Sequence, residues 1–358
     1  GWDTNVDVIY ANASMTTQNG NLMGTNAESD GVHMLNSNSG FILEGGTIDV
    51  KGDNAYGIVT NGQEVNNTVT LKYSTLNVPN GYGIYFPSTG TVTIENSIIN
   101  AKYVGVQLCA GSLDVKGEQT AITVTDQNDG KKEDDGVIGD GAAISIVKRD
   151  GYQALGTVSI TAGTFNAADT AKAVKAYTFN NSDKTEGEWE DANETVAVSG
   201  GSFSSGVAKY VTAGNYSVGQ ADGMFVVQSA PPANSIRDDE GNYYENEEIA
   251  AAGSVASIMN DNGTTYYASF EAAMEKVTEG DTLNLWKDVR LAPQDSGDDF
   301  INLPSNVTLN GNGKTITADT SNWSGEDRHV IGIDNAADVT VQNLKIVGDY
   351  TEDADDPK

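Results

Sequence analysis

Short stretches of alternating apolar and polar residues recur along the chain. In the clearest unit, GTVTIENSIINA from Gly90 to Ala101, one such stretch is followed by a polar corner and a second short stretch. Alternation of this kind predicts β-strands that bury one face. A third apolar piece separates successive units, as in YGIVT at Tyr56, YGIYF at Tyr82 and VGVQL at Val104. The chain is therefore built from repeats of three short strands.

The spacing of the repeats predicts the fold class. Ile58, Ile84 and Val106 occupy the same place in successive units, at intervals of roughly two dozen residues. Three strands and three corners per repeat form one coil of a right-handed parallel β-helix, which adds about 4.8 Å of axis. Alternate Leu, Val and Ile side chains then point inward and stack on the next coil, while Thr, Ser, Asn and Asp point outward. We expect an all-β solenoid of this type.

Changes in composition divide the chain into three parts. Residues 1–227 form the first β-helix, which is interrupted by an acidic, glycine-rich insertion from Asp126 to Gly141 that must leave the coils as a loop. Residues 228–253 begin with a small-residue stretch containing a Pro pair, and we interpret them as a linker. Residues 254–358 are predicted to form a hairpin, a capping α-helix and the first coils of a second β-helix.

Two local signals define the start of this last part. Asn262-Gly263 lies between two strand-like runs and predicts a type I′ hairpin turn. The following segment predicts one short helix, with Ser269 as N-cap and Gly280 after its end. Its apolar stripe, which we expect to plug the first coil, is Phe270, Ala273, Met274 and Val277.

Composition narrows the possible partners. The 358 residues carry a formal net charge of −31, with a sequence pI near 4.1, so neither nucleic acid nor an anionic membrane is an expected partner. No apolar run reaches transmembrane length, and no signal peptide is evident. We expect the chain to be a piece of a longer secreted or surface-attached protein. The single cysteine, Cys109, lies among apolar strand residues and is predicted to be a small core residue.

Two longer segments resemble a known family. Residues Gly201 to Val227, GSFSSGVAKYVTAGNYSVGQADGMFVV, resemble the closing segment of β-helix modules in large cell-surface proteins of Gram-positive bacteria. The segment from Thr264 to Val289, TTYYASFEAAMEKVTEGDTLNLWKDV, is similar to the opening segment of the next such module. The NGNGKTI turn at Asn310 also resembles the first coil of the wider pectin-lyase-like superfamily. This resemblance implies the architecture and a surface location, but that superfamily includes both enzymes and non-catalytic adhesins.

The sequence lacks the motifs expected of a catalytic member of the pectin-lyase-like superfamily. Hydrolases of this superfamily pair acidic motifs with Gly-His-Gly, whereas the only histidines, His33 and His329, lie in or beside predicted strands. The Asp134-Asp135 pair is inside the insertion, and Arg149 lacks the surrounding motif of a lyase. One cysteine and two histidines also exclude a zinc site. We therefore assign no catalytic residue.

The insertion offers a possible calcium site. Hard oxygen ligands are dense there and suit Ca²⁺, although their spacing is not that of an EF-hand and a merely solvated acidic loop is the alternative. No cofactor is otherwise required by the sequence. The candidate ligands are Asp126, Asn128, Asp129, Asp134 and Asp135.

Tyrosines on neighbouring coils offer a possible ligand platform. Tyr56 and Tyr82 occupy the same place in successive YGI motifs, Tyr103 lies close to it on the next coil, and Tyr85 alternates with Ile84. A column of exposed rings could stack on sugars or bind a protein partner, and the alternative is a structural aromatic stack.

We expect a non-catalytic, surface-exposed, adhesin-like module that binds a host or environmental glycan or protein. The alternatives are a polysaccharide hydrolase or lyase on the same fold and a structural spacer.

Overall fold

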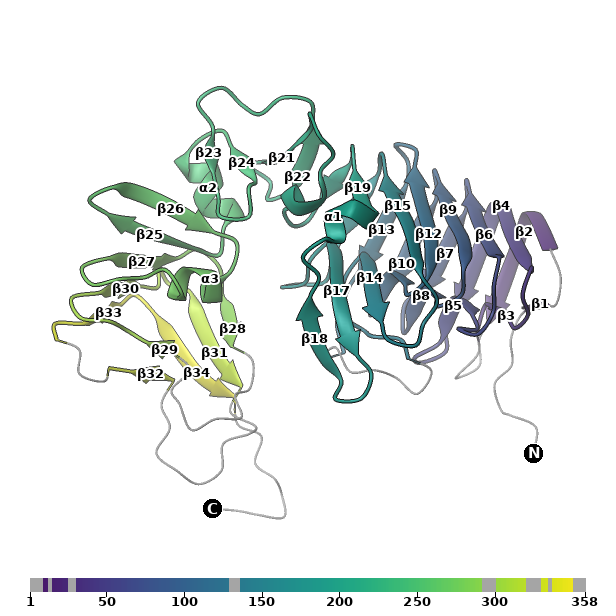
Figure 1. Ribbon diagram of the computed structural model, residues 1–358, viewed down its shortest axis with the longest axis horizontal. Helices are drawn as coiled ribbons and strands as arrows, with labels where there is room; N and C mark the ends of the chain where they lie inside the picture. The colour runs from purple at the N-terminus through teal and green to yellow at the C-terminus, as the bar shows by residue number, and fades with distance from the viewer. Residues whose placement is uncertain are drawn as a thin grey trace, which may run out of the picture. The chain divides into compact units, whose positions relative to one another are not determined.

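The chain folds into two compact units of stacked parallel strands (Figure 1). The computed structural model describes residues 9–11, 15–24, 30–128, 136–291, 301–319, 330–333 and 337–349. Unit 1 comprises Gly1–Val218 and Met224–Pro231, and unit 2 comprises Gly219–Gly223 and Pro232–Lys358. The predicted β-solenoid class is confirmed.

One face of unit 1 is an eight-stranded sheet, here called sheet A. Each strand pairs in parallel with the strand one coil further on, apart from the antiparallel pair β17–β18 at the end. All residues of β18 are exposed. The charges of Glu186 and Glu188 disfavour the pairing of a further strand at this sheet edge. The strands are β1 (Ile9–Ala11), β3 (Val32–Met34), β5 (Tyr56–Thr60), β8 (Tyr82–Phe86), β11 (Val104–Leu108), β14 (Ile144–Arg149), β17 (Val174–Asn180) and β18 (Thr185–Glu188).

The other two faces of unit 1 share the long strands β2 (Met15–Gly24) and β4 (Gly40–Val50), which pair with each other and pass around the corner between the faces. Face B1 also contains β6 (Asn67–Lys72), β9 (Gly90–Glu95), β12 (Gly111–Lys116), β15 (Leu155–Ile160) and β19 (Val196–Val198). Face B2 contains β7 (Thr75–Val78), β10 (Ile98–Ala101), β13 (Ala121–Val124), β16 (Thr164–Asn166), β20 (Ser202–Phe203) and β22 (Phe225–Gln228). The remaining elements of unit 1 are α1 (Ala192–Thr195), the 3₁₀ turn η1 (Ala208–Tyr210) and most of β21 (Tyr216–Gly219).

Identical positions of successive coils stack into apolar columns inside unit 1. On face B1 the strand registers bring inward side chains of six coils into one column, and every member is at most 1% exposed. Burying a side chain of this size contributes about 1.5–3 kcal/mol relative to leaving it in water. The column consists of Phe41, Val69, Val92, Leu113, Val158 and Val196.

Unit 2 begins with elements that the sequence analysis places in a linker. The predicted linker at 228–253 contains β23 (Ile236–Arg237), β24 (Tyr243–Tyr244) and α2 (Glu247–Gly253). Asn246 caps α2 by accepting a hydrogen bond from the amide of Ile249, and Asp238 is buried beneath Tyr244, whose hydroxyl donates to its carboxylate over 2.7 Å. Burial raises the pKa of the Asp238 carboxyl. This segment is therefore folded.

The predicted hairpin and helix are both present in unit 2. Strands β25 (Ala256–Asn260) and β26 (Gly263–Tyr267) pair antiparallel, but only Gly263 of the predicted turn pair has a positive φ, so the turn is not type I′. Helix α3 (Phe270–Met274) is capped by Ser269, whose side chain accepts from the Ala272 amide. The apolar stripe of α3 packs into the core of unit 2, as expected.

The rest of unit 2 repeats the parallel coil pattern in three small sheets. The pairs β27–β30, β30–β33, β28–β31, β31–β34 and β29–β32 are all parallel. The coils form around the core that contains Leu283, Leu309 and Ile316. The strands are β27 (Thr282–Leu285), β28 (Val289–Leu291), β29 (Ile301–Asn302), β30 (Thr308–Asn310), β31 (Thr315–Asp319), β32 (Ile331–Gly332), β33 (Thr340–Gln342) and β34 (Lys345–Asp349).

Candidate functional site

The tyrosines predicted as a platform do lie together, on the outer face of sheet A. The rings of Tyr56 and Tyr82 stack with centroids 5.2 Å apart, and Tyr82 and Tyr103 follow at 5.4 Å. However, Tyr56, Tyr82 and Tyr85 are only 8%, 0% and 2% exposed, and Tyr103 is half-buried. The expectation of an exposed column is therefore wrong for three of the four rings, and the structural alternative describes them better.

The tyrosines are buried because a short segment of the insertion folds back over them. Residues 136–141, here called the strap, lie on the outer face of sheet A, with Val137 and Ile138 completely buried against the cluster. The outer face of sheet A is apolar as well as the inner one, so it needs such a cover. The predicted loop therefore does not leave the coils along its whole length: its last six residues pack on them.

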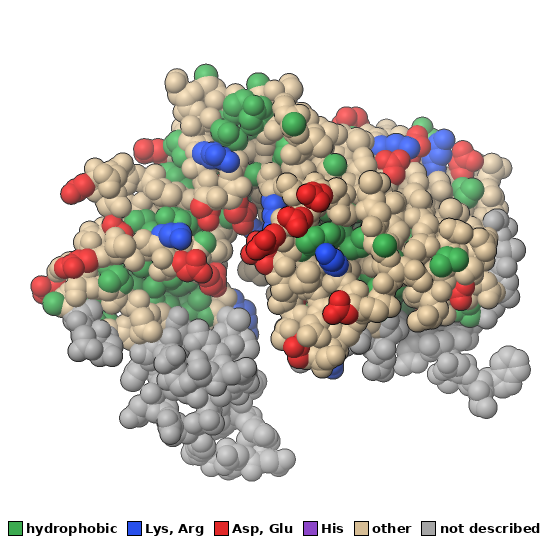
Figure 2. Space-filling view, in the orientation of Figure 1, with side chains coloured by type: hydrophobic (Ala, Val, Ile, Leu, Met, Phe, Trp, Pro, Cys, Tyr) green, Lys and Arg blue, Asp and Glu red, His purple; other side chains and the backbone are tan. Residues whose placement is uncertain are grey.

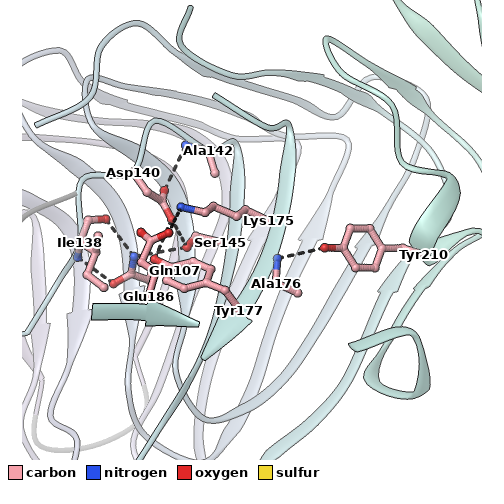
Figure 3. Close-up of polar contacts among 10 residues, drawn as sticks. All are labelled: Gln107, Ile138, Asp140, Ala142, Ser145, Lys175, Ala176, Tyr177, Glu186 and Tyr210. Carbon is pink, nitrogen blue, oxygen red and sulfur yellow. Dashed lines mark hydrogen bonds and ion pairs between the residues drawn. The ribbon is translucent and has the colours of Figure 1, made fainter. Parts of the chain in front are cut away.

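A glutamine side chain holds the centre of the strap. Gln107 is fully buried on β11, and its Nε2 donates to the Ile138 carbonyl over 2.9 Å while its Oε1 accepts from the Ile138 amide over 2.9 Å (Figure 3). The side chain thus pairs with both backbone groups of Ile138, as a neighbouring strand would. A buried backbone without partners would cost about 1–3 kcal/mol for each group, so this pairing makes the covered arrangement stable.

A buried carboxylate holds the end of the strap. Asp140 is 6% exposed, and its Oδ2 accepts hydrogen bonds from the Ser145 hydroxyl at 2.6 Å and the Tyr177 hydroxyl at 2.9 Å (Figure 3). Its Oδ1 accepts from the Ala142 amide at 3.1 Å. Burial, and secondarily the charge of Asp140, raise the pKa of Tyr177 well above its ordinary value, so this hydroxyl stays protonated and donates.

The second side of Tyr177 is covered by the β17–β18 hairpin. Lys175 places its Nζ 4.4 Å from the centroid of the Tyr177 ring and bonds Glu186 of β18 at 2.6 Å (Figure 3). The network of Gln107, Asp140, Ser145 and Tyr177 is thus sealed between the strap and sheet A. A hydroxyl beside a carboxylate without a histidine base is not an activated nucleophile, so the arrangement is suited to holding the strap rather than to catalysis.

The predicted calcium ligands divide between described and undescribed residues. Asn128 donates from Nδ2 to the Tyr82 hydroxyl at 3.0 Å, and Asp126 lies 3.9 Å from the Lys102 ammonium group. Asp129, Asp134 and Asp135 lie outside the described residues. In the described ranges, no group of three or more His, Cys, Asp or Glu side chains is placed to hold a metal ion. The calcium site stays a prediction.

The single cysteine is buried, and the described histidine lies near a carboxylate. Cys109 is 1% exposed within the cluster beneath the strap, as predicted for a core residue, and burial raises the pKa of its thiol to about 12. His33 lies on β3 with its Nδ1 3.6 Å from the carboxylate of Asp30. His329 lies outside the described residues.

An outward-facing ladder on face B2 was missed in the sequence analysis. Asn77 donates from Nδ2 to Asp49 Oδ1 at 2.7 Å, and Asn100 donates from Nδ2 to Asn77 Oδ1 at 2.8 Å. The column continues through Thr123 to Asn166, which are paired in register on β13 and β16. The signal was present in the sequence as the third residue of TIDV, TLNV and IINA, but its meaning depends on a register that only the fold defines.

A ladder of alternating charge runs along the neighbouring face B1. The strand registers place Glu44, Lys72, Glu95 and Lys116 side by side on four successive coils. The hydrogen bond that Lys116 donates to the Asp114 carboxylate, and the charge of that carboxylate, raise the pKa of Lys116. On this view of the molecule, carboxylates are also numerous near α1, in keeping with the acidic composition (Figure 2). Faces B1 and B2 therefore present ordered polar side chains, unlike the covered outer face of sheet A.

Comparisons with protein-family models, curated proteins and solved structures return no match for this chain. No helix among the described residues is long and apolar enough to cross a membrane.

Proposed function

We propose that the chain is a non-catalytic β-helix module of a surface-exposed, adhesin-like protein, and that it binds a glycan or a surface protein of the host or the environment. The proposal places the module outside the cell. It follows the resemblance of the two segments described above and the absence of the motifs expected of hydrolases and lyases on this fold.

The observation that carries the binding proposal is the ladder of Asp49, Asn77 and Asn100. Asn77 uses one N–H and its oxygen within the column and Asn100 uses one N–H, so the two side chains are held in one orientation before a ligand arrives. Fixing side chains in advance lowers the conformational entropy that binding would otherwise cost. The second N–H of each amide remains available to a ligand on the half-buried to exposed surface.

A repeating glycan fits this surface better than a compact small molecule. The ladder repeats once per coil, at about 4.8 Å, and therefore offers similar hydrogen-bonding groups at regular intervals along the axis. Hydroxyl groups of a sugar chain both donate and accept, so they match carboxylate and amide groups together. Ile98, 40% exposed on the same face, adds an apolar contact beside the ladder.

The proposal is tested by incubating the full chain with a panel of plant and mucosal glycans in calcium buffer while both retained protein and released sugar are measured. Retention without release is the predicted result. Sugar release would contradict the non-catalytic proposal and support a polysaccharide hydrolase or lyase. If neither occurs with glycans or with host surface proteins, the module is a spacer.

A further inference from the structure

Arg149 is a buried cation at the end of sheet A. It is the last residue of β14, is 6% exposed, and lies between two rings, with its Cζ 4.9 Å from the centroid of Phe179 and 5.3 Å from that of Tyr152. In an acidic protein, a guanidinium of this kind would be expected to pair with a carboxylate. None of the carboxylates in the described residues forms an ion pair with it.

The hydrogen bonds of Arg149 use only one of its three nitrogens. Nη1 lies 3.5 Å from the Tyr152 hydroxyl and 3.4 Å from Asn181 Oδ1. Nε and Nη2 are both buried, and neither has a hydrogen-bond acceptor among the residues that the structure describes. These two nitrogens form one edge of the guanidinium, and that edge is the one that binds a carboxylate through two parallel hydrogen bonds.

Two neighbouring ionisable groups in the described part of the chain, Tyr85 and Cys109, do not neutralise this charge. Burial raises the pKa of Tyr85 well above its ordinary value and raises that of Cys109 to about 12, so both remain neutral at physiological pH. A buried charge without a counterion destabilises a protein by several kcal/mol. An anion that reached this edge would therefore remove an existing energetic penalty as well as form new bonds.

We propose that the Nε–Nη2 edge of Arg149 binds the carboxylate of a small acidic ligand, such as a sugar acid. The hydroxyls of Tyr85 and Tyr152, 3.2 Å apart, lie on the other side of the same guanidinium, near Nη1. Gly136 packs closely against these hydroxyls, because a Cβ there would lie 2.7 Å from the Tyr152 hydroxyl and 2.9 Å from the Tyr85 hydroxyl. This site is separate from the ladder on face B2 and does not depend on its ligand.

Access to the site requires a movement of Tyr152. This residue is half-buried and lies in the turn after β14, beside the exposed Gly151, and its ring packs against the guanidinium. Rotation of one aromatic side chain in a turn is a modest rearrangement compared with the separation of packed strands. The Tyr152→Ala variant should therefore bind the same ligands more tightly or more rapidly than the native chain.

The proposal is tested by calorimetric titration of the full chain with sodium glucuronate and sodium acetate, at constant ionic strength set by sodium chloride. The variants are Arg149→Met, which keeps the length of the side chain without its charge, and Arg237→Met, which removes an exposed arginine as a matched control. We expect saturable carboxylate binding by the native chain and by Arg237→Met, and its loss in Arg149→Met. Sodium sulfate serves as a further arm, because it has the charge but not the planar geometry of a carboxylate.

Folding of the variants is checked by thermal melts. Unfolding is followed by chemical labelling of the Cys109 thiol, which becomes accessible when unit 1 unfolds. Without ligand, Arg149→Met should melt no lower than the native chain, since it removes an uncompensated charge. If Arg149→Met does not fold, Tyr152→Ala still tests the proposal, because it should strengthen carboxylate binding. No carboxylate binding by the native chain, equal binding by Arg149→Met, or a response to sulfate alone would each overturn the proposal.

Discussion

Asn128 donates a hydrogen bond from its side-chain amide to the hydroxyl of Tyr82 across 3.0 Å. From the sequence alone, the two residues are predicted to belong to different sites, Asn128 to a calcium loop and Tyr82 to an aromatic platform. Their contact shows that the beginning of the insertion packs against the tyrosine cluster. Together with the strap, it converts an apparent ligand platform into part of a second apolar core outside the coils.

Tyr82 should therefore contribute mainly to the stability of unit 1 rather than to ligand binding. Replacing a fully buried ring by Ala removes packing with Tyr56 and Tyr103, so Tyr82→Ala should lower the free energy of unfolding by about 3–5 kcal/mol. Tyr82→Phe keeps the ring and loses the bond to Asn128, which should cost about 1 kcal/mol. Urea unfolding of both variants measures these values. A Tyr82→Ala chain as stable as the native one would mean that the ring is not packed as described.

Asp140 should hold the strap in place. Asp140→Ala leaves the buried hydroxyls of Ser145 and Tyr177 without their acceptor, so we expect a loss of about 3 kcal/mol. Hydrogen exchange at the amides of Ile138 and Ala142 should accelerate, while exchange on face B1 stays close to native. The control Asp169→Ala removes an exposed carboxylate and should change stability by no more than about 0.5 kcal/mol. Unchanged exchange in the strap would contradict the role given to Asp140.

The glycine in each YGI motif should be required by the spacing of the coils. A Cβ on Gly83 would lie 2.1 Å from the carbonyl oxygen of Gly105 on the next coil, and neither backbone can move without disturbing the stack. Gly83→Ala should therefore destabilise unit 1 by about 3 kcal/mol. At Gly62 a Cβ would lie 3.5 Å from Pro87, an ordinary contact, so Gly62→Ala should be neutral or slightly stabilising. Similar melting temperatures for the two variants would rule out the close approach of the coils.

Cys109 should make unit 1 less stable at high pH. Its folded pKa is raised by burial from 9.0 to about 12, so the unfolded thiol loses its proton first as the pH rises. The contribution of the buried neutral thiol to the free energy of unfolding is complete below about pH 9. It is lost between about pH 9 and about pH 12, at up to about 1.4 kcal/mol per pH unit. Cys109→Ala should flatten this decline partly, because buried Tyr85 shifts in the same direction. Equal slopes of unfolding free energy against pH in the two chains would show that the thiol is not buried.

The sequence predicts the repeated elements of this protein well, because their signals are local and periodic. Alternating residues define the strands, the spacing of Ile58 and Ile84 defines the coil, and the stripe beginning at Phe270 defines α3. The turn after Asn260 was misassigned because its type depends on which residue adopts a positive φ, and here Gly263 alone does so. Helix α2 was missed because a Pro pair nearby suggested a linker.

The strap could not be predicted, because its partners are distant in sequence. Gln107 and Ile138 are 31 residues apart, and nothing in either local pattern indicates that one side chain pairs with the backbone of the other. The alternation of Ile84 and Tyr85 correctly predicts opposite faces, but it cannot show that the outer face is covered as well. Register-dependent features, such as the ladder of Asp49, Asn77 and Asn100, require the coils to be aligned first.

The central claim is that this module binds its partner through outward-facing polar ladders and does not cleave it. The most direct test compares glycan retention and sugar release for the native chain, the double variant Asn77→Ala with Asn100→Ala, and Tyr82→Phe as a control with a buried change. We predict retention by the native chain and by Tyr82→Phe, its loss in the double variant, and no released sugar with any of them. Released sugar, or full retention by the double variant, would contradict the account.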